Sequence, residues 1–255
     1  MLLRNLLAHP LTRHLDLNDP RLTELRKEVI RSKPFLLKIY QDWYTWIAGC
    51  VPDGDGAVLE LGSGAGFLDE FIPDLVTSEL FFCRDITLVT DGQQLPFASA
   101  SLRAIVFTDV LHHLPQVRLF FHEAARCLQP GGRVIMIEPW VSTWSRFIYP
   151  LLHHERFDPG APTWEFRSSG PLSGSNQALP WIIFSRDRQQ FASEFPEWHI
   201  RQVLPQMPLR YLLSGGLTTR TLSQRGAAWS YDFWKWLEGG FGSNGMFAGI
   251  VLERN

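Results

Sequence analysis

The chain has 255 residues, of which 45% are hydrophobic and 20% charged, a composition typical of a globular protein and not of a disordered one. Its 24 basic and 26 acidic residues give a formal net charge of −2, so no basic surplus indicates nucleic acid or an anionic membrane as a partner. Three cysteines are too few for a disulfide framework or a cysteine-rich zinc site, and no run of about 18 apolar residues predicts a transmembrane helix.

The N-terminal segment, residues 1–56, is predicted to be helical. Its first nine residues form an apolar patch that Arg4 interrupts, without a small-residue cleavage site, so we expect no secretory signal and a cytoplasmic location. Asp19-Pro20 is a helix cap followed by a proline, and apolar residues then recur at helical spacing. The aromatic residues at this spacing are expected in the core; they are Tyr40, Trp43 and Trp46.

Residues 57–138 alternate short apolar segments with turns and helices. Strands are predicted over residues 57–61, 75–78, 86–90, 104–108 and 133–137. Short apolar runs bounded by turn residues are typical of strands that are buried on both faces of a parallel sheet. An amphipathic helix precedes the last of these strands, and Pro130-Gly131-Gly132 is expected to end it.

The rest of the chain is predicted to complete the same single domain. Residues 139–184 are rich in Trp, Pro, Gly and His without clear periodicity, so we expect an aromatic cap inserted over the sheet. Residues 185–255 return to regular structure, with a helix near 186–194, strands over 199–204 and 246–252, and a helical insertion over 205–240.

The most specific motif is a glycine-rich loop that follows the first predicted strand. Glycines at positions 62, 64 and 66 let the backbone approach a ligand closely, and the helix expected next offers free N–H groups. A dinucleotide fingerprint requires its third glycine at the position of Phe67, and Glu60 suits a positively charged ligand better than a pyrophosphate. The loop therefore argues against a nicotinamide-dependent oxidoreductase, which we keep as the weaker alternative.

Together with four further motifs in the same order, this loop resembles the class I S-adenosylmethionine-dependent methyltransferases, and most closely the ubiquinone/menaquinone-type group. The further motifs are Glu79 at the end of the second strand, Asp91 before Leu95-Pro96-Phe97, Leu111-His112-His113-Leu114 after the fourth strand, and Leu128 to Gly132. The resemblance implies an α/β Rossmann-like fold with a mostly parallel seven-stranded sheet, helices on both faces and an antiparallel last strand. It also implies methyl transfer from S-adenosylmethionine to a small or medium-sized acceptor, which the aromatic cap suggests is aromatic or apolar.

The resemblance assigns the cofactor to the carboxyl ends of the first four strands. Glu79 is expected to accept hydrogen bonds from the ribose hydroxyls and Asp91 from the adenine amine, with Leu80 and Gly92 beside the ring. The expected cofactor-binding residues are Glu60, Gly62, Ser63, Gly64, Gly66, Glu79, Leu80, Asp91, Gly92, Thr108 and Asp109. The short gap between Glu79 and Asp91 leaves little room for a helix, so another element, such as the N-terminal helices, is expected to cover the adenine.

His113, or failing that His112, is the candidate general base. An imidazole titrates near neutral pH, and a hydroxyl acceptor must lose a proton. A hydrogen-bonded structural role is the alternative for either histidine.

The acceptor site is predicted to lie in the cap, and no metal site is expected. Candidate acceptor-binding residues are Trp140, Trp144, His153, His154 and Trp164. A metal is not expected, because adjacent histidines point in different directions and no His-x-x-x-His spacing occurs. The expected partner is a small molecule, the oligomeric state stays open, and a non-catalytic S-adenosylmethionine-binding accessory protein is the other alternative.

Overall fold

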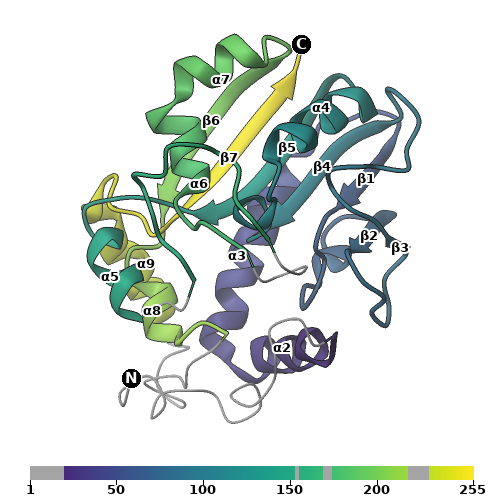
Figure 1. Cartoon of the computed structure of the whole chain (residues 1–255). Helices are drawn as coiled ribbons and strands as arrows, with labels where there is room; N and C mark the ends of the chain where they lie inside the picture. The colour runs from purple at the N-terminus through teal and green to yellow at the C-terminus, as the bar shows by residue number, and fades with distance from the viewer. Residues whose placement is uncertain (1–19, 153–154, 169–173, 218–229) are drawn as a thin grey trace.

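The computed structural model of the protein describes residues 20–152, 155–168, 174–217 and 230–255. They form one seven-stranded sheet with helices packed against both of its faces (Figure 1). The strands are β1 (Ala57–Glu60), β2 (Leu75–Glu79), β3 (Leu88–Val89), β4 (Leu102–Thr108), β5 (Leu128–Pro139), β6 (Trp198–Gln206) and β7 (Phe247–Arg254). The longer helices are α2 (Pro20–Ser32), α3 (Pro34–Cys50), α4 (Val117–Cys127), α5 (Ser145–Leu152), α7 (Arg188–Glu194) and α9 (Tyr231–Glu238). Short helical segments are η1 (Leu68–Glu70), η2 (Leu111–His113), α6 (Leu179–Trp181), η3 (Ile182–Arg186), α8 (Arg210–Ser214) and η4 (Gly239–Phe241).

The sheet has the predicted topology. Its strand order is β3-β2-β1-β4-β5-β7-β6; β1 to β5 pair in parallel, and β7 is antiparallel to both β5 and β6. The expected mostly parallel seven-stranded sheet with an antiparallel last strand is therefore confirmed. Most strand boundaries differ from the prediction by one or two residues. Two strands differ more in extent: β3 keeps only two residues, and β5 begins at Leu128, directly after the end of α4.

Helix α3 covers one face of the sheet. Its buried residues Leu36, Ile39 and Trp43 belong to one apolar cluster with Val106 of β4 and Ile135 of β5. The close packing of α3 against β7, the strand next to the β6 edge of the sheet, depends on a glycine of β7. A Cβ atom at Gly249 would lie 2.8 Å from the ring of Trp46, so a side chain there would push α3 away from β7.

Helices α4 and α7 cover the opposite face of the sheet. In the chain, α6 and η3 directly precede α7. Phe107 of β4 packs edge-on against Phe120 of α4, and Phe121 packs in the same way against Phe191 of α7. Figure 1 shows α4 and α3 on opposite sides of the central strands. The two layers bury both faces of the central parts of β4 and β5, which explains why residues 104–107 and 134–137 are all apolar.

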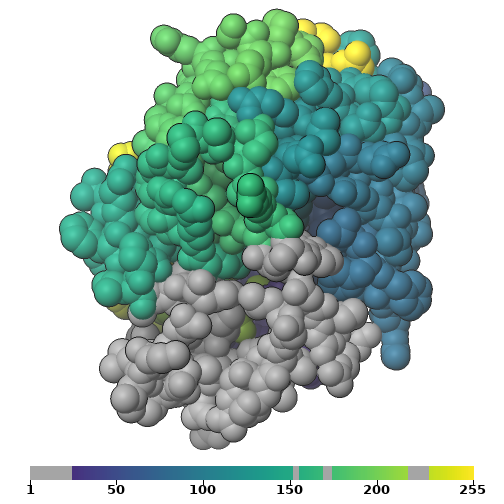
Figure 2. Space-filling model, in the orientation of Figure 1, coloured from purple at the N-terminus to yellow at the C-terminus, as the bar shows by residue number. Residues whose placement is uncertain are grey.

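The segment after β5 is more regular than its sequence predicted. A helical run starts at Leu179, several residues before the expected helix near 186, with Pro180 in its first turn. Leu179, Ile182 and Ile183 are all buried, and a helix buried on several sides lacks the one-sided periodicity that the prediction used. In Figure 2 this segment, in green, and the region of β2 and β3, in blue, lie on opposite sides of the face that is turned toward the reader.

The connection between β2 and β3 contains no helix, as expected from its length. In the helical insertion predicted over 205–240, the structure shows α8 and α9, and residues 218–229 lie outside the described residues. No helix of the described chain combines the length and apolar character needed to cross a membrane.

Candidate active site

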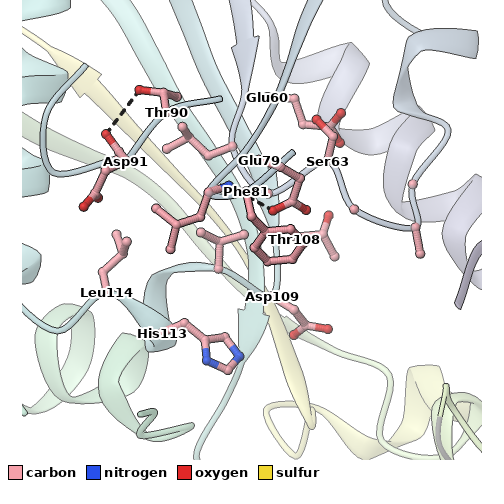
Figure 3. A pocket seen from close by; sticks show the side chains of 18 of the residues that line it. Glu60, Ser63, Glu79, Phe81, Thr90, Asp91, Thr108, Asp109, His113 and Leu114 are labelled. Carbon is pink, nitrogen blue, oxygen red and sulfur yellow. Dashed lines mark hydrogen bonds between the residues drawn. The ribbon is translucent and has the colours of Figure 1, made fainter. Parts of the chain in front are cut away.

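A cavity of about 400 Å³ opens at the carboxyl ends of β1, β2 and β4. This position is where the strand order changes direction, because β2 and β4 follow β1 in the chain but lie on opposite sides of it. Open α/β sheets bind ligands at such points. All eleven residues predicted to hold a cofactor line this cavity, as does His113 (Figure 3).

The glycine-rich loop forms one wall of the cavity. Gly62 and Gly64 have φ angles of +63° and +44°, a backbone conformation that disfavours other residues. A Cβ atom at Gly62 would lie 2.7 Å from Cγ2 of Val110, and one at Gly66 would lie 2.7 Å from the hydroxyl oxygen of Tyr44. The loop is thus pressed against its neighbours and presents bare backbone to the cavity.

Hydrogen bonds fix the loop to the neighbouring strand. The Ser63 N–H donates to the Ser78 carbonyl at 2.9 Å, and the Ser78 N–H donates to the Ser63 hydroxyl at 3.0 Å. The Ser78 hydroxyl in turn donates to the Glu60 carbonyl at 2.7 Å. The ends of β1 and β2 therefore hold the loop in one conformation, which suits a preformed binding site.

Carboxyl groups dominate the chemistry of the cavity. Burial raises the pKa of Glu60 to about 8 and that of Asp109 to about 7, and it raises the pKa of Glu79 as well. Arg26 of α2 is the only Lys or Arg among the described residues that line the cavity. A positively charged ligand would stabilise the ionised form of these carboxyl groups, whereas a pyrophosphate would be repelled by that form and would raise their pKa values further.

Two polar groups are placed to recognise a ligand. The buried Thr108 hydroxyl has no hydrogen-bond partner within the described part of the chain, and it lines the cavity. The Asp91 carboxylate accepts the Gln93 N–H at 2.8 Å, which holds the turn after β3. In Figure 3, Asp91 and Glu60 lie on different sides of the cavity, with Glu79 and Phe81 between them.

The N-terminal helices contribute cavity-lining residues that the sequence did not predict to be part of the site. Arg26 of α2 and Tyr40 and Tyr44 of α3 line the cavity. Tyr40 is in the core, as expected, but it also borders the cavity. Helical periodicity predicted the buried face of α3, but it carried no signal that this face passes over the glycine loop.

The two histidines lie in η2, the short turn that follows β4. His113 lines the cavity, and its Nδ1 lies 3.3 Å from the Gly174 carbonyl oxygen. His112 is buried behind it, with its Nδ1 2.7 Å from a carboxylate oxygen of Glu138, a buried residue of β5. The other oxygen of Glu138 accepts the N–H groups of Val110 and Leu111, both at 2.7 Å.

Glu155 brings the two rings together from the segment after α5. Nε2 of His112 lies 3.4 Å from one of its carboxylate oxygens, and Nε2 of His113 lies 3.8 Å from the other. The ring centroids are 4.2 Å apart, so the expectation that these adjacent side chains diverge is wrong. They converge because a tight 3₁₀ turn, and not a strand or a regular helix, carries them.

The electrostatic environments of the two rings differ. Burial would lower the pKa of His112, but the carboxylates of Glu138 and Glu155 outweigh it and raise that pKa well above its usual range. Burial and the neighbouring His112 lower the pKa of His113. The unliganded site therefore favours a charged His112 and a neutral His113.

The tryptophans predicted to bind the acceptor do not line this cavity. Trp140 and Trp164 are buried in the core, and Trp164 donates its indole N–H to Asp187 at 2.9 Å. Trp144 is partly buried, and its indole N–H donates to the Pro208 carbonyl at 2.7 Å. The segment after β5 folds back onto the sheet and buries these rings. His153 and His154 lie outside the described residues.

Comparison with known proteins gives a family match over part of the chain and a shared fold. A family model described as a methyltransferase domain matches residues 59–136. The comparison with curated proteins found no match.

Two solved structures are similar over nearly the whole chain. One is geranyl diphosphate C-methyltransferase from Streptomyces coelicolor A3(2), in complex with Mg²⁺, geranyl diphosphate and S-adenosyl-L-homocysteine; it is 14% identical, with a TM-score of 0.52 over 97% of this chain and 91% of that one. The other is a complex between the Haloferax volcanii Trm112 methyltransferase activator and a methyltransferase, 14% identical, with a TM-score of 0.52 over 94% of this chain and 98% of that one. At this identity the two structures establish the shared fold.

Proposed function

We propose that this chain is a class I S-adenosylmethionine-dependent methyltransferase, which binds S-adenosylmethionine in the cavity and methylates a small molecule that enters beside His113. The observation that carries the proposal is the convergence of all eleven motif residues on one cavity rich in carboxyl groups. A nicotinamide cofactor fits this cavity poorly, because its pyrophosphate would face Glu60, Glu79 and Asp109.

The cofactor supplies an activated methyl group on a positively charged sulfur when it is bound. Glu79 ends β2 inside the cavity, where its carboxylate can accept from a ribose diol. Asp91 and Gly92 border the part of the cavity that suits the adenine. Arg26 is the cationic group available to the cofactor's carboxylate, and the bare backbone of the Gly62–Gly66 loop can lie against the amino-acid portion.

The acceptor side of the site is formed by the turn after β4. Val110, Leu114 and Pro115 line the cavity there and supply an apolar surface that excludes water, next to His113 and Asp109. Because the pKa of His113 is lowered, its imidazole is neutral near pH 7 and can accept a hydrogen bond from an acceptor hydroxyl or amine. We assign His113 to orienting the acceptor and receiving its proton, and His112 to holding the turn.

The cofactor assignment is tested by calorimetry. The protein should bind S-adenosylmethionine and S-adenosylhomocysteine and should not bind NAD. Binding of NAD with no binding of S-adenosylmethionine would contradict the proposal.

Turnover is tested separately, because a non-catalytic accessory protein would bind the cofactor equally well. A fluorescent assay for released S-adenosylhomocysteine, run over phenols, quinol precursors, sugars and amines, should give release that depends on one acceptor class. Cofactor binding without release from any class would favour the accessory role.

A further inference from the structure

The turn after β4 and the segment after α5 bring three metal-ligating side chains together. The ligand atoms of His112, His113 and Glu155 all lie within 4.8 Å of one another. The two histidines are adjacent in the chain, and only the tertiary structure brings Glu155 to them. Two imidazoles and one carboxylate form a donor set that suits zinc and iron(II).

Both rings are oriented by a partner on their other nitrogen. Nδ1 of His112 faces the Glu138 carboxylate at 2.7 Å, and Nδ1 of His113 faces the Gly174 carbonyl at 3.3 Å. A carbonyl and a carboxylate accept hydrogen bonds, so each Nδ1 carries a proton and donates it. In the neutral form of each ring, the lone pair is then on Nε2, the atom nearest to Glu155. Histidine ligands of metals are commonly held in this way by a carboxylate or a carbonyl.

The separations suit a metal ion of this class. Zinc–nitrogen bonds of about 2.0–2.1 Å place two tetrahedral ligand atoms about 3.4 Å apart. Nε2 of His112 already lies 3.4 Å from a Glu155 oxygen, and Nε2 of His113 lies 3.8 Å from the other oxygen. The ligand atoms of the three residues lie within 4.8 Å of one another, so the partly exposed side chains of His113 and Glu155 would have to move by up to about 1.4 Å to complete three bonds.

Glu155 already accepts hydrogen bonds from the Ser175 hydroxyl at 3.5 Å and the Gln177 amide at 3.3 Å, and a cation between its carboxylate and the two rings would add an attractive interaction to these contacts. A proton on His112, held between Glu138 and Glu155, is one such cation, and a divalent metal is the other. A proton on Nε2 of His112 needs only one acceptor, so Glu155 would have to approach that ring alone. In the structure the Glu155 carboxylate also approaches the ring of His113. The second ring therefore favours the metal.

We propose that His112, His113 and Glu155 form a binding site for a divalent transition-metal ion of the zinc or iron(II) class, with Glu138 as the residue that positions His112. Three protein ligands leave one position of a tetrahedral site open, and one of the three ligands, His113, lines the cavity. The binding of metal stands by itself, and its use in the reaction rests on the proposed methyl transfer. A metal ion on Nε2 of His113 would replace that nitrogen as the group that receives the acceptor's proton, and the ion would instead hold the acceptor as a Lewis acid.

The site is tested with tag-free protein that has been stripped with a chelator and titrated with Co²⁺. We expect one Co²⁺ per chain, a visible absorption band of a four- or five-coordinate site, and competition by Zn²⁺. Glu155→Gln and His113→Ala should each weaken Co²⁺ binding by more than 10-fold, and Glu138→Gln by about 10- to 100-fold. The matched control is His199→Ala, which removes an exposed histidine of β6 and should bind Co²⁺ like the unaltered protein.

Several outcomes would overturn the site. These are absence of the absorption band in the unaltered protein, or equal Co²⁺ affinity in Glu155→Gln, His113→Ala and the control. Thermal unfolding of each variant ensures that a lost band is not a lost fold, and Glu155→Asp should keep the band with a shifted maximum. S-adenosylhomocysteine binding is measured on the same samples, so failure of the cofactor assignment is distinguished from failure of the metal site.

Discussion

A carboxylate oxygen of Glu138 lies 2.7 Å from Nδ1 of His112, and this contact joins the end of β5 to the turn after β4. Both side chains are buried. The other oxygen of Glu138 accepts two backbone N–H groups of the same turn, from Val110 and Leu111. One acidic residue of β5 therefore determines the shape of the turn that brings His113 to the cavity.

Replacing Glu138 should destabilise the protein. Glu138→Ala would leave two buried N–H donors and a buried imidazole without their acceptor, so we expect a loss of about 3–5 kcal/mol in the free energy of unfolding, measured by urea denaturation. Asp53→Ala, which removes an exposed acid in the linker before β1, should change stability by less than about 0.5 kcal/mol. Equal stability of the two variants would show that Glu138 does not hold the turn.

The glycine loop should not tolerate side chains. Gly64→Val places a β-branched residue at a φ of +44°, and Gly66→Ala places a Cβ atom 2.7 Å from the Tyr44 hydroxyl, so calorimetry should show loss of S-adenosylmethionine binding in both. Gly49→Ala in α3 is the matched control, because nothing lies within 4 Å of its added Cβ atom. Unchanged affinity in the loop variants would place the cofactor elsewhere.

Glu79 should act on the ribose. Loss of a charge-assisted hydrogen bond costs about 1.5–3 kcal/mol, so Glu79→Ala should raise the dissociation constant for S-adenosylmethionine by roughly 10- to 150-fold. The loss should be much smaller with an analogue that lacks the ribose hydroxyls, whereas Asp91→Ala should weaken both ligands alike. Equal losses for Glu79→Ala with both ligands would remove its assignment to the ribose.

The unliganded protein should lose stability as the pH rises, because of two cavity acids. Burial raises the pKa of Asp109 from 3.8 to about 7 and that of Glu60 from 4.5 to about 8, so between about pH 4 and 8 the folded state binds more protons than the unfolded chain. Stability then falls as pH rises through this window. Asp109→Asn keeps a side chain that tolerates the positive φ of 59° and should reduce the fall between pH 4 and 7.

This prediction is checked by thermal denaturation of Asp109→Asn and of the unaltered protein at several pH values. The quantity compared is the difference in stability between these two proteins at each pH. Taking the difference removes the effect of other titrating groups that both proteins share. Parallel curves for Asp109→Asn and the unaltered protein would show that Asp109 ionises normally.

His113 should affect turnover and not cofactor affinity. His113→Ala should leave S-adenosylmethionine affinity within a few fold, while kcat with a hydroxyl acceptor falls by about 100-fold or more through loss of the proton acceptor. The experiment compares kcat, KM and the pH profile of the variant with those of the unaltered protein. A rise in KM at constant kcat would mean that His113 only binds the acceptor, and lost cofactor binding would support a structural role.

Local sequence was enough to predict the sheet, and it placed the expected cofactor residues on one cavity. Strands buried on both faces read as apolar runs, and four of the expected cofactor residues lie at the end of such a run or directly after it. Chain order alone therefore brings Glu60, Glu79, Asp91 and Thr108 to one edge. The glycines could be recognised because the loop needs positive φ angles at Gly62 and Gly64, which is a property of the residue itself.

Contacts between distant segments were decided by the tertiary structure. Arg26 and Tyr44 line the cavity because α2 and α3 pack beside the loop, and Trp164 is buried because its nonperiodic segment folds back onto α4 and α7. Glu155 meets His112 and His113 only after the chain has passed through β5 and α5. Hydrophobic periodicity describes one element and its buried face, whereas the choice of neighbours depends on how all elements pack together, and this is where the histidine cluster arises.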